Sequence, residues 1–521
     1  MVRPAGEAWN LGGPEKGPRG PFSCLGGRGG IYWGVEIEII VDNRVRVVGT
    51  GQLARDVVSG LKSEFEHDNP EWTKKRRLGL PTWSEPKTLR TWREEGSQLS
   101  FPRGGLARVT RVLREAGIDA KVRDARQYGV AVEMPEFRRE LYPYQREIVE
   151  RAIEREQCII RAATGGGKTS ALLAIAAEVS VPTLVVVHSQ ALMDQWKARA
   201  VSELGLRPKQ IGIVQGKKFD LRPFTITIQK TMARVAAESK EVRDYFGCVI
   251  GDEIHLFAAN SFFACIDPFP ARYRIGASAD HRRKDRKEFL IHDLFGDVAA
   301  DVSRAQLVGS GHILEVEIRV VPTDFAAPWY GIPDGPEDER QLDFVRLVKE
   351  MAGDPERNFA AVRIVRSEVA SGEQVLVMAH EREHCMRLGQ TLTAMGIRAG
   401  YLLGGQESAS EFAKTLEGLK RGTVQVGVGT YKAIGTGIDL PGVGVAVGVT
   451  PISSNEQFFG QVRGRVCRTA KGKTAARLYV LLDEHVYPTH LKNIVKWNTS
   501  VVVRDSVGDW LPVEAYLRTA R

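Results

Sequence analysis

The stretch AATGGGKTS, residues 162–170, decides the fold of the region around it. It follows the short apolar run CII and precedes the helix-like run ALLAIAAEV. Three successive glycines allow backbone N–H groups to converge on an anion, and the start of the following helix adds partial positive charge. A strand, a glycine turn and a helix that opens with Lys-Thr predict a phosphate-binding P-loop. The stretch departs from the full pattern only at Ala162, where glycine is usual.

The P-loop gives single residues expected roles in binding ATP and Mg²⁺. Lys168 supplies a mobile cation for the outer phosphates, and the Thr169 hydroxyl ligates Mg²⁺. A glycine turn that merely opens a helix is the alternative, but such a turn would not need Gly-Lys-Thr in this context. The other residues expected at the cofactor are Thr164, Gly165, Gly166, Gly167 and Ser170.

The stretch GDEIH, residues 251–255, places two acids where an apolar run ends. A lone Asp-Glu pair is usually a solvated turn. In a P-loop domain, however, the end of a neighbouring strand faces the same phosphates. We therefore expect Asp252 to hold the metal ion and Glu253 to orient and deprotonate the attacking water.

Short apolar strands alternate with helical stretches from Leu141 onward. The first series reads CIIRAA, TLVVVHS, TITIQ, CVIGDE and YRIGASA, and the second reads QVLVMAH, AGYLL, VQVGVGT, VGVAVGV and RLYVLL. This rhythm indicates parallel sheets built from βαβ units. The expected fold class is α/β, with two parallel-sheet domains in tandem behind a small α/β accessory domain.

The composition is that of an ordinary globular protein, with 43% hydrophobic and 26% charged residues. No apolar run approaches the ~18 to 20 residues of a membrane span, so we expect no membrane partner. Six cysteines stand singly without C-x-x-C spacing, which favours a reducing cytoplasm over a zinc site or disulfide framework. The net charge of +9 is compatible with a polyanionic partner.

The 521 residues suggest roughly three domains. The expected segments are a disordered Gly/Pro-rich tail (1–30), an accessory domain (31–135), a first parallel-sheet domain (136–322), a linker (323–358), a second such domain (359–490) and a C-terminal tail (491–521).

With both motifs placed, the chain resembles the superfamily 2 helicases of the DExH type over roughly residues 141–482. The resemblance implies two RecA-like domains, the second of which carries arginine fingers. LYPYQ at 141–145 is similar to the adenine-reading segment, which implies Gln145 as the base contact. GASAD at 276–280 carries Asp280 where the family has the threonine of Ser-Ala-Thr.

Further motifs imply nucleic-acid and nucleotide contacts. VVVHSQALMDQW (185–196), TITIQKT (225–231) and GTYKAIGTGIDLP (429–441) resemble segments that touch the nucleic acid. The implied nucleic-acid contacts are Ser189, Gln190, Gln229, Lys230, Thr231 and Thr430, and the implied nucleotide contacts of the third motif are Gly437 and Asp439.

QFFGQVRGRVCR, residues 457–468, resembles the arginine-finger motif of the second domain. Its Gln461, Arg465 and Arg468 would approach the γ-phosphate across the cleft between the domains. Guanidinium groups stabilise charge on a transferring phosphoryl group. Fingers on a second domain would make catalysis conditional on domain closure. A basic helix face in contact with solvent or phosphate backbone is the alternative.

Within the superfamily the chain is most similar to the UvsW/XPB-like branch, which includes phage helicases. The stretch NPEWTKKRRLGLPTW, residues 69–83, resembles their N-terminal module. Basic residues in it can bind phosphates and its tryptophans can stack on bases, although a solvated basic helix face is nearly as plausible. The basic residues are Lys74, Lys75, Arg76 and Arg77. For the basic cluster at 281–287 we also favour a DNA contact over a soluble loop.

The resemblance implies ATP-dependent unwinding or branch migration of forked and junction DNA in recombination, repair or replication restart, with 3′ to 5′ polarity. The expected setting is a monomeric enzyme in a bacterial or phage-infected cytoplasm. A double-stranded DNA translocase, an RNA helicase and an ATP-dependent clamp remain alternatives.

Overall fold

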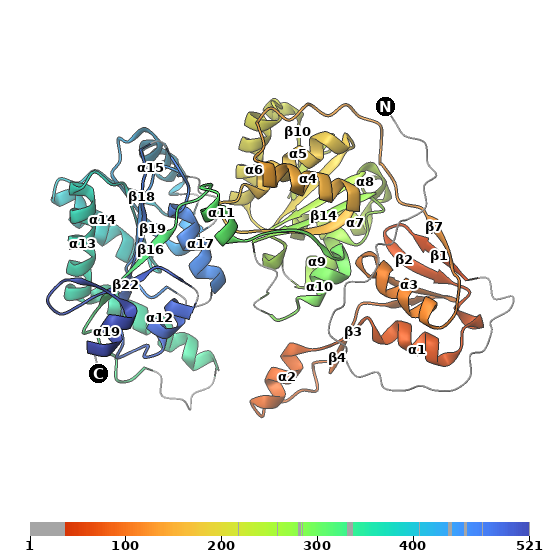
Figure 1. Cartoon of the computed structure of the whole chain (residues 1–521), viewed down its shortest axis with the longest axis horizontal. Coiled ribbons are helices and arrows are strands. Elements are labelled where there is room, and N and C mark those ends of the chain that lie inside the picture. The colour runs from red at the N-terminus through yellow and green to blue at the C-terminus, as the bar shows by residue number, and fades with distance from the viewer. Residues whose placement is uncertain are drawn as a thin grey trace.

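The computed structural model describes residues 37–216, 218–257, 259–279, 283, 285–330, 337–405, 407–435, 440–452, 456–470, 472–496 and 498–519. Three units follow one another along these residues: an accessory domain, a first parallel-sheet lobe and a second parallel-sheet lobe (Figure 1). The tail expected at 1–30, and the expected site residues Gly437 and Asp439, lie outside the described residues, as do Asp280 and the side chain of Gln461.

The accessory domain is a mixed sheet covered by helices, in the strand order β5-β6-β2-β1-β7. Its buried core includes Val45, Val47, Phe65 and Phe101. The elements are β1 (Glu38–Val41), β2 (Arg44–Val48), η1 (Thr50–Gln52), α1 (Arg55–Ser63), β5 (Arg93–Glu95), β6 (Gln98–Pro102), η2 (Arg103–Gly105), α3 (Leu106–Glu115) and β7 (Lys121–Asp124). Between α1 and β5 the chain forms β3 (Glu66–Asp68), α2 (Pro70–Arg77) and β4 (Thr88–Arg90).

The first lobe has the strand order β11-β10-β12-β9-β13-β14-β8-β15, and its neighbouring strands are parallel except β10 and β11. Strands β9 and β13 are buried along their whole length, because helices cover both faces of a parallel sheet. Its strands are β8 (Gln157–Ala162), β9 (Thr183–Val187), β10 (Ile211–Gln215), β11 (Lys218–Asp220), β12 (Phe224–Ile228), β13 (Cys248–Asp252), β14 (Tyr273–Ser278) and β15 (Val298–Val302). Its helices are α4 (Pro143–Arg155), α5 (Lys168–Val179), α6 (Gln190–Glu203), η3 (Pro208–Gln210), α7 (Gln229–Glu238), α8 (Lys240–Tyr245), η4 (Ile254–Leu256), α9 (Ala259–Ile266), α10 (Phe289–Phe295) and α11 (Arg304–Gly309).

The second lobe repeats this architecture in the strand order β18-β19-β17-β20-β21-β16-β22-β23. Its strands are β16 (Val316–Pro322), β17 (Val375–Ala379), β18 (Ala399–Leu402), β19 (Val426–Thr430), β20 (Val445–Gly448), β21 (Ala476–Leu482), β22 (Val501–Arg504) and β23 (Trp510–Pro512). Its helices are α12 (Glu337–Gly353), α13 (Pro355–Ala370), α14 (Arg382–Ala394), α15 (Ala409–Arg421), α16 (Tyr431–Gly435), α17 (Glu456–Val466), α18 (His490–Lys496) and α19 (Val513–Thr519). The expected α/β class with two tandem RecA-like domains and an N-terminal α/β domain is confirmed.

The expected boundaries of the lobes need correction. Strand β16 was placed at the end of the first domain, but it pairs with β21 and β22 in the second sheet. Residues 491–521 are likewise no separate tail, because β22 and β23 extend that sheet. The pairing of β16 with β21 and β22 joins strands more than 150 residues apart, so it could not be predicted from local sequence.

The segment expected as a linker, 323–358, contains α12 and the start of α13. Leu347 and Met351 of α12 are buried together with Ala327 in a small core. Val486 and Tyr487, which follow β21, pack on this core. The segment is therefore an integral part of the second lobe.

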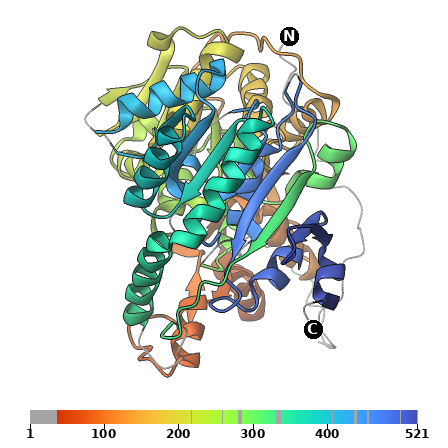
Figure 2. The same ribbon diagram turned by 90° about the vertical axis from the view of Figure 1, so that its left-hand side faces the viewer.

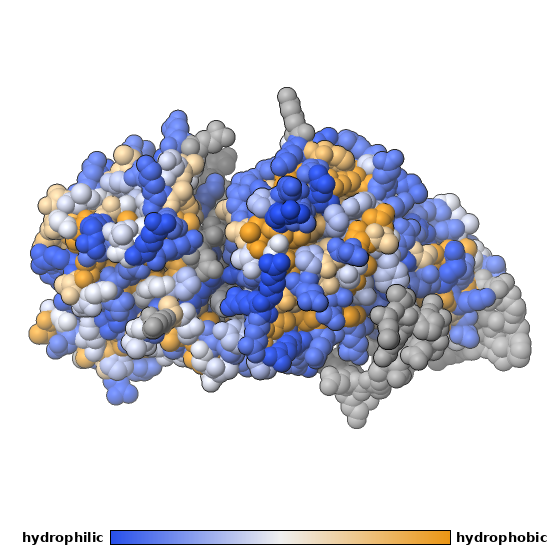
Figure 3. Space-filling model, turned by 90° about the horizontal axis from the view of Figure 1, so that it is seen from above, coloured by the Kyte–Doolittle hydropathy of each residue, from blue (hydrophilic) through white to orange (hydrophobic). Residues whose placement is uncertain are grey.

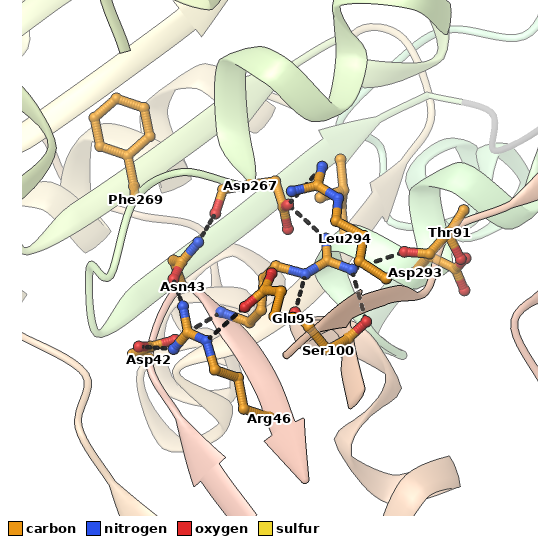
Figure 4. Close-up of polar contacts among 12 residues, drawn as sticks. Asp42, Asn43, Arg46, Thr91, Glu95, Ser100, Asp267, Phe269, Asp293 and Leu294 are labelled. Atoms are coloured by element: carbon orange, nitrogen blue, oxygen red, sulfur yellow. Dashed lines mark hydrogen bonds and ion pairs between the residues drawn. The ribbon is translucent and has the colours of Figure 1, made fainter. Parts of the chain in front are cut away.

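Buried ion pairs attach the accessory domain to the first lobe (Figure 4). Arg44 of β2 is 1% exposed, and its Nη1 lies 2.6 Å from Oδ2 of Asp267, which follows α9. The Asn43 side chain donates to the Asp267 carbonyl at 3.2 Å, and Arg274 donates to the Asn43 carbonyl at 3.0 Å. A buried charge held by several partners fixes the orientation of the two units.

The whole molecule is elongated, with the second lobe at one end and the accessory domain at the other (Figures 1 and 2). A space-filling view from above shows a furrow between the two lobes, within a mostly hydrophilic surface (Figure 3). In the described part of the chain, no helix is long and apolar enough to cross a membrane.

Candidate ATP site

The glycine loop joins β8 to α5, and its backbone needs glycine at two positions. Gly165 has φ +93° and Gly167 has φ +67°, in the region that residues with a side chain rarely adopt. A Cβ at Gly167 would also overlap Nε2 of Gln145. The loop is therefore a tight backbone cradle that a larger residue at Gly167 would fill.

Lys168 opens α5 and is buried beside this loop. Its Nζ donates to the Ala162 carbonyl at 2.9 Å and lies 3.6 Å from Oε1 of Glu253. Thr169 follows in the first helical turn, and Ser170 is buried, where its hydroxyl accepts a 3.2 Å hydrogen bond from Arg199 of α6. A cation, two hydroxyls and a carboxylate thus meet at one end of α5.

Helix α4 braces the loop from the other side. The Tyr144 hydroxyl donates to the Gly166 carbonyl at 2.9 Å. The Gln145 amide donates to the Gly167 carbonyl at 3.3 Å, and its oxygen accepts from the Tyr142 N–H at 3.0 Å. Gln145, expected as a base contact, is therefore a direct support of the loop in this structure.

A cavity of about 450 Å³ lies next to Tyr144, between α4, β15 and α11. Its volume suits a small heteroaromatic group. The lining residues are Pro143, Tyr144, Glu147, Ile148, Arg151, Ala300, Asp301, Val302, Gln306, Leu307, Ser310 and His312.

Asp252 ends β13 with a buried carboxylate that two donors orient. The backbone N–H of Glu253 donates to its Oδ1 at 2.9 Å, and the indole N–H of Trp196 donates to its Oδ2 at 2.8 Å. Trp196 lies on α6 and is fully buried. The indole was not foreseen, because α6 is brought to β13 only by the fold.

Glu253 has left-handed backbone angles, φ 51° and ψ 47°. Such a conformation costs a residue with a side chain on the order of 1 kcal/mol or more. Its Oε2 lies 3.5 Å from Nδ1 of His255 and accepts from the Ala279 N–H at 3.4 Å. His255 is in turn 2.6 Å from the Ser278 hydroxyl, so the catalytic loop touches the end of β14.

The two acids have opposite pKa shifts. Burial, together with the charge of Glu253, raises the pKa of Asp252 to about 6. Burial also acts to raise the pKa of Glu253, but the charges of Lys168 and His255 outweigh it and the pKa is lowered. Glu253 is therefore held ionised, which a general base requires.

Helix α17 carries the expected fingers from the second lobe to the glycine loop. Gly464 packs against Thr164 so closely that a Cβ there would overlap the Thr164 side chain. One residue on, Arg465 has a pKa lowered by burial and partly restored by the charge of Glu253. The second lobe thus contributes a guanidinium whose pKa responds to the charge of Glu253 in the first lobe.

Arg468 follows α17 and forms a strand bridge with Ile313. Burial, together with the positive charges of Arg199 and Arg139, lowers its pKa to about 10. Since Arg199 contacts Ser170, Arg468 belongs to a cationic group at the start of α5.

The expected nucleic-acid residues of the lobes lie at the carboxyl ends of strands β9, β12 and β19. Ser189 and Thr430 accept backbone hydrogen bonds at the starts of α6 and α16. The side chain of Gln190 donates to Asp194 at 2.9 Å. Lys230 is exposed and Thr231 half-buried, whereas Gln229 is only 4% exposed, which disfavours a direct contact.

In the basic cluster at 281–287, Arg283 does not face solvent. It is 6% exposed and donates to the Phe257 carbonyl at 2.8 Å and to Asp285. The expectation of a DNA contact is wrong for this residue, because its guanidinium is hydrogen-bonded within the protein, to the loop that follows Glu253.

Two families match the two lobes of this site. The family described as type III restriction enzyme, res subunit, matches residues 138–283, and the helicase conserved C-terminal domain matches residues 358–470. The probable helicase D10 of Escherichia phage T5 is 24% identical over 318 residues, which are 61% of this chain and 66% of that protein. The DNA 3′-5′ helicase XPB of Mycobacterium tuberculosis is 29% identical over 315 residues, 58% of this chain and 53% of that protein.

The chain is similar in both lobes to superfamily 2 helicases, and the matches to D10 and XPB support the UvsW/XPB type. It spans between about half and two thirds of the length of these two relatives. A fragment assigned as an HsdR subunit of a type I restriction enzyme from Vibrio vulnificus shares the fold. Its TM-score is 0.50 at 15% identity, covering 84% of this chain and 83% of that one.

The residues of this helicase-family site fit ATP and Mg²⁺. The glycine cradle offers backbone N–H groups to phosphates, and the buried Lys168 offers a cation. Asp252 and Thr169 supply the hard oxygen ligands that Mg²⁺ prefers. Bound Mg²⁺ would supply neutralisation of the phosphate charge.

Proposed function

We propose that this chain is an ATP-dependent DNA helicase or translocase that acts on forked and junction DNA. The observation that carries the proposal is the packing of Gly464, from the second lobe, on Thr164 of the glycine loop, which brings the neighbouring Arg465 to that loop, where the charge of Glu253 acts to raise its pKa. A site completed by two lobes hydrolyses ATP only when they are together. Alternation between closed and open lobes would then move a strand that both lobes bind.

The hydrolytic step assigns one task to each residue. Glu253 accepts a proton from the water that attacks the γ-phosphorus, and the bond from that phosphorus to the bridging oxygen of ADP breaks. Lys168 binds the outer phosphates, Asp252 and Thr169 hold the metal ion, and Arg465 stabilises charge on the transferred group. Arg468 and Gln461 would assist from the same segment. Gly437 and Asp439 would contact the nucleotide.

The base of ATP would occupy the cavity beside Tyr144, whose ring and neighbouring apolar side chains suit an adenine. Gln145 would sense the base through the loop that it supports. Because Gln145 also holds the Gly167 carbonyl, its replacement should weaken ATP binding by way of the loop.

The polymer would run across the starts of α6, α7 and α16. Helix starts attract phosphates, and Ser189, Lys230, Thr231 and Thr430 lie there. The name of the XPB relative, a DNA 3′-5′ helicase, supports DNA as the polymer and 3′ to 5′ as the polarity. The accessory domain, with Lys74 to Arg77, would bind the branch point.

Strand displacement with labelled forks tests this proposal. A fork with a 3′ single-stranded arm should be opened with ATP and Mg²⁺, a fork with only a 5′ arm much more slowly, and neither with a non-hydrolysable ATP analogue. A triplex-displacement assay separates the translocase alternative. Displacement of the third strand without opening of any fork would contradict strand separation.

A further inference from the structure

The segment Glu66–Arg90 forms an arm that stands away from the accessory domain. Strands β3 and β4 pair antiparallel at its base, from Glu66 opposite Arg90 to Asp68 opposite Thr88. Helix α2 lies between these two strands in the chain and contains no buried residue. Figure 1 shows α2 apart from the sheets of the accessory domain and of the two lobes. The arm is thus a protrusion rather than part of a core.

Hydrogen bonds within the arm fix its shape. Asn69 is 1% exposed, caps α2 by accepting from the Glu71 N–H at 3.1 Å, and donates to the Pro86 carbonyl at 2.8 Å. Lys75 lies 3.0 Å from Glu85, which ties α2 to the returning chain. A preformed arm loses little conformational entropy on binding.

The surface of the arm combines positive charge with exposed apolar groups. Lys74, Arg76 and Arg77 are exposed on α2. Trp83, in the returning segment, is 89% exposed, and Leu78 and Leu80 are 44% and 46% exposed. Exposed apolar groups gathered on one protrusion beside charged residues are typical of an interaction surface.

Trp72 behaves differently from Trp83. It is half-buried beneath Arg76, at 5.2 Å from the ring centroid, and Lys87, at 5.8 Å. Its indole therefore supports the arm, so Trp83 is left as the indole with a free face.

The base of the arm is anchored on α10. The buried carboxylate of Asp293 accepts from the Thr91 hydroxyl at 2.6 Å, lies 3.1 Å from Nε2 of His67, and pairs with Arg108. The His67 ring also stacks on Phe289 at 3.9 Å. The arm consequently has a fixed position on the first lobe.

The anchor is connected to the catalytic loop. Helix α10 follows the segment in which Glu288 accepts from the Arg283 N–H at 2.9 Å. Arg283 in turn donates to the Phe257 carbonyl, at the end of the loop that begins at Glu253. A rearrangement of that loop during hydrolysis can therefore be transmitted to the arm through these hydrogen bonds and α10.

We propose that the arm contacts nucleic acid at the point where duplex gives way to single strands, with Trp83 stacking on an unpaired base. Stacking on an indole replaces the stacking that a base loses when its pair opens, and the basic residues of α2 bind the flanking phosphates. This rests on the proposed function, and it adds the group that holds the opened base.

The first test uses DNA binding without ATP. A fork carrying 2-aminopurine as the first unpaired base is titrated with the full chain, with Trp83→Ala and with Trp83→Phe. The matched control is Phe359→Ala, which removes another aromatic ring that is 61% exposed, on α13. We expect quenching with the full chain, Trp83→Phe and Phe359→Ala. We expect its loss, with about 5-fold or more weaker fork binding, in Trp83→Ala.

The second test measures fork opening and ATPase rates of the same variants. Trp83→Ala should open forks at least about 5-fold more slowly, while its ATPase rate without DNA equals that of the full chain. If Trp83→Ala quenches 2-aminopurine, binds forks and opens forks as well as the unaltered chain does, the proposed stacking role of Trp83 is overturned. That result would fit instead a protein partner for the arm. If the unaltered chain opens no fork, the proposed function fails, whereas the quenching experiment still decides the role of Trp83.

Discussion

Asp252 and Glu253 are adjacent in sequence, yet their surroundings give them different protonation behaviour. Asp252 is buried against Trp196 and its pKa is raised to about 6, whereas Lys168 and His255 lower the pKa of Glu253. The left-handed backbone at Glu253 turns its carboxylate toward Lys168 instead of along the strand. One strand end thus presents the proposed metal ligand and the proposed base side by side.

Replacement of Glu253 by Gln should lower kcat for ATP by about 10²–10⁴-fold, because the amide cannot accept the proton of water. ATP affinity should change little, since the side chain keeps its size. Rapid-quench or coupled ATPase assays measure the first quantity, and equilibrium binding of a fluorescent ATP analogue the second. Glu238→Gln, at an exposed position on α7, is the control. An active Glu253→Gln variant would remove this residue from the role of base.

Trp196→Phe should shift the pH dependence of kcat/KM for Mg·ATP. The indole N–H stabilises the ionised form of Asp252, so its loss raises the pKa of Asp252 beyond about 6. A neutral carboxyl binds Mg²⁺ poorly, so kcat/KM falls as pH drops through that pKa. The acid limb should therefore lie at higher pH in the variant than in the unaltered chain. Superimposable limbs would show that the hydrogen bond does not tune the metal ligand.

At the scale of elements, α17 decides whether the site is complete. Its Gly464 packs on Thr164 of the glycine loop, so Arg465 is brought to that loop, and to the proposed base Glu253, only when the lobes are in contact. The position of the proposed finger therefore depends on the packing of α17, from the second lobe, on the glycine loop of the first lobe.

Arg465→Lys should lower kcat by at least about 100-fold, because arginine fingers contribute about 10³–10⁵ and lysine cannot reproduce the planar fork. ATP binding should be retained. Arg463→Lys, on the same helix but hydrogen-bonded to Asn498 within the second lobe, is the matched control and should stay near the unaltered rate. Equal losses in both variants would point to damage of α17 rather than to a finger.

The sequence revealed the elements whose signal is local. Strands β8, β9 and β13 are short apolar runs because both faces of their sheet are buried. The order of β16, β22 and β23 was not predictable, since it depends on pairing across the chain. In the site, Lys168 follows from the glycine motif, and the acid pair follows from its place at a strand end in a P-loop domain. Trp196 does not, because 56 residues separate it from Asp252.

At the scale of the whole molecule, the accessory domain is fixed to the first lobe rather than tethered. Arg44 and Asp267 form a buried ion pair at that boundary, and the Asp293 anchor holds the base of the arm on α10. The accessory domain, with the proposed branch-binding surface, therefore keeps a set position on the first lobe.

Asp267→Ala should destabilise this boundary by about 3–5 kcal/mol, because it leaves the Arg44 guanidinium buried without its carboxylate. The loss should show as a lower urea midpoint and as faster proteolysis between the accessory domain and the lobe. Asp244→Ala removes an exposed pair with Lys240 and should cost less than about 1 kcal/mol. Equal stability of both variants would contradict a rigid attachment.

The central claim, that ATP hydrolysis in this chain is coupled to DNA, is tested most directly by steady-state ATPase rates. The rates are measured without polymer, with single-stranded DNA, with a branched DNA junction and with RNA, and Glu253→Gln serves as the blank. We predict strong stimulation by DNA, greatest with the junction. Equal rates in all four conditions would contradict a nucleic-acid motor, and stimulation by RNA alone would contradict DNA as its polymer.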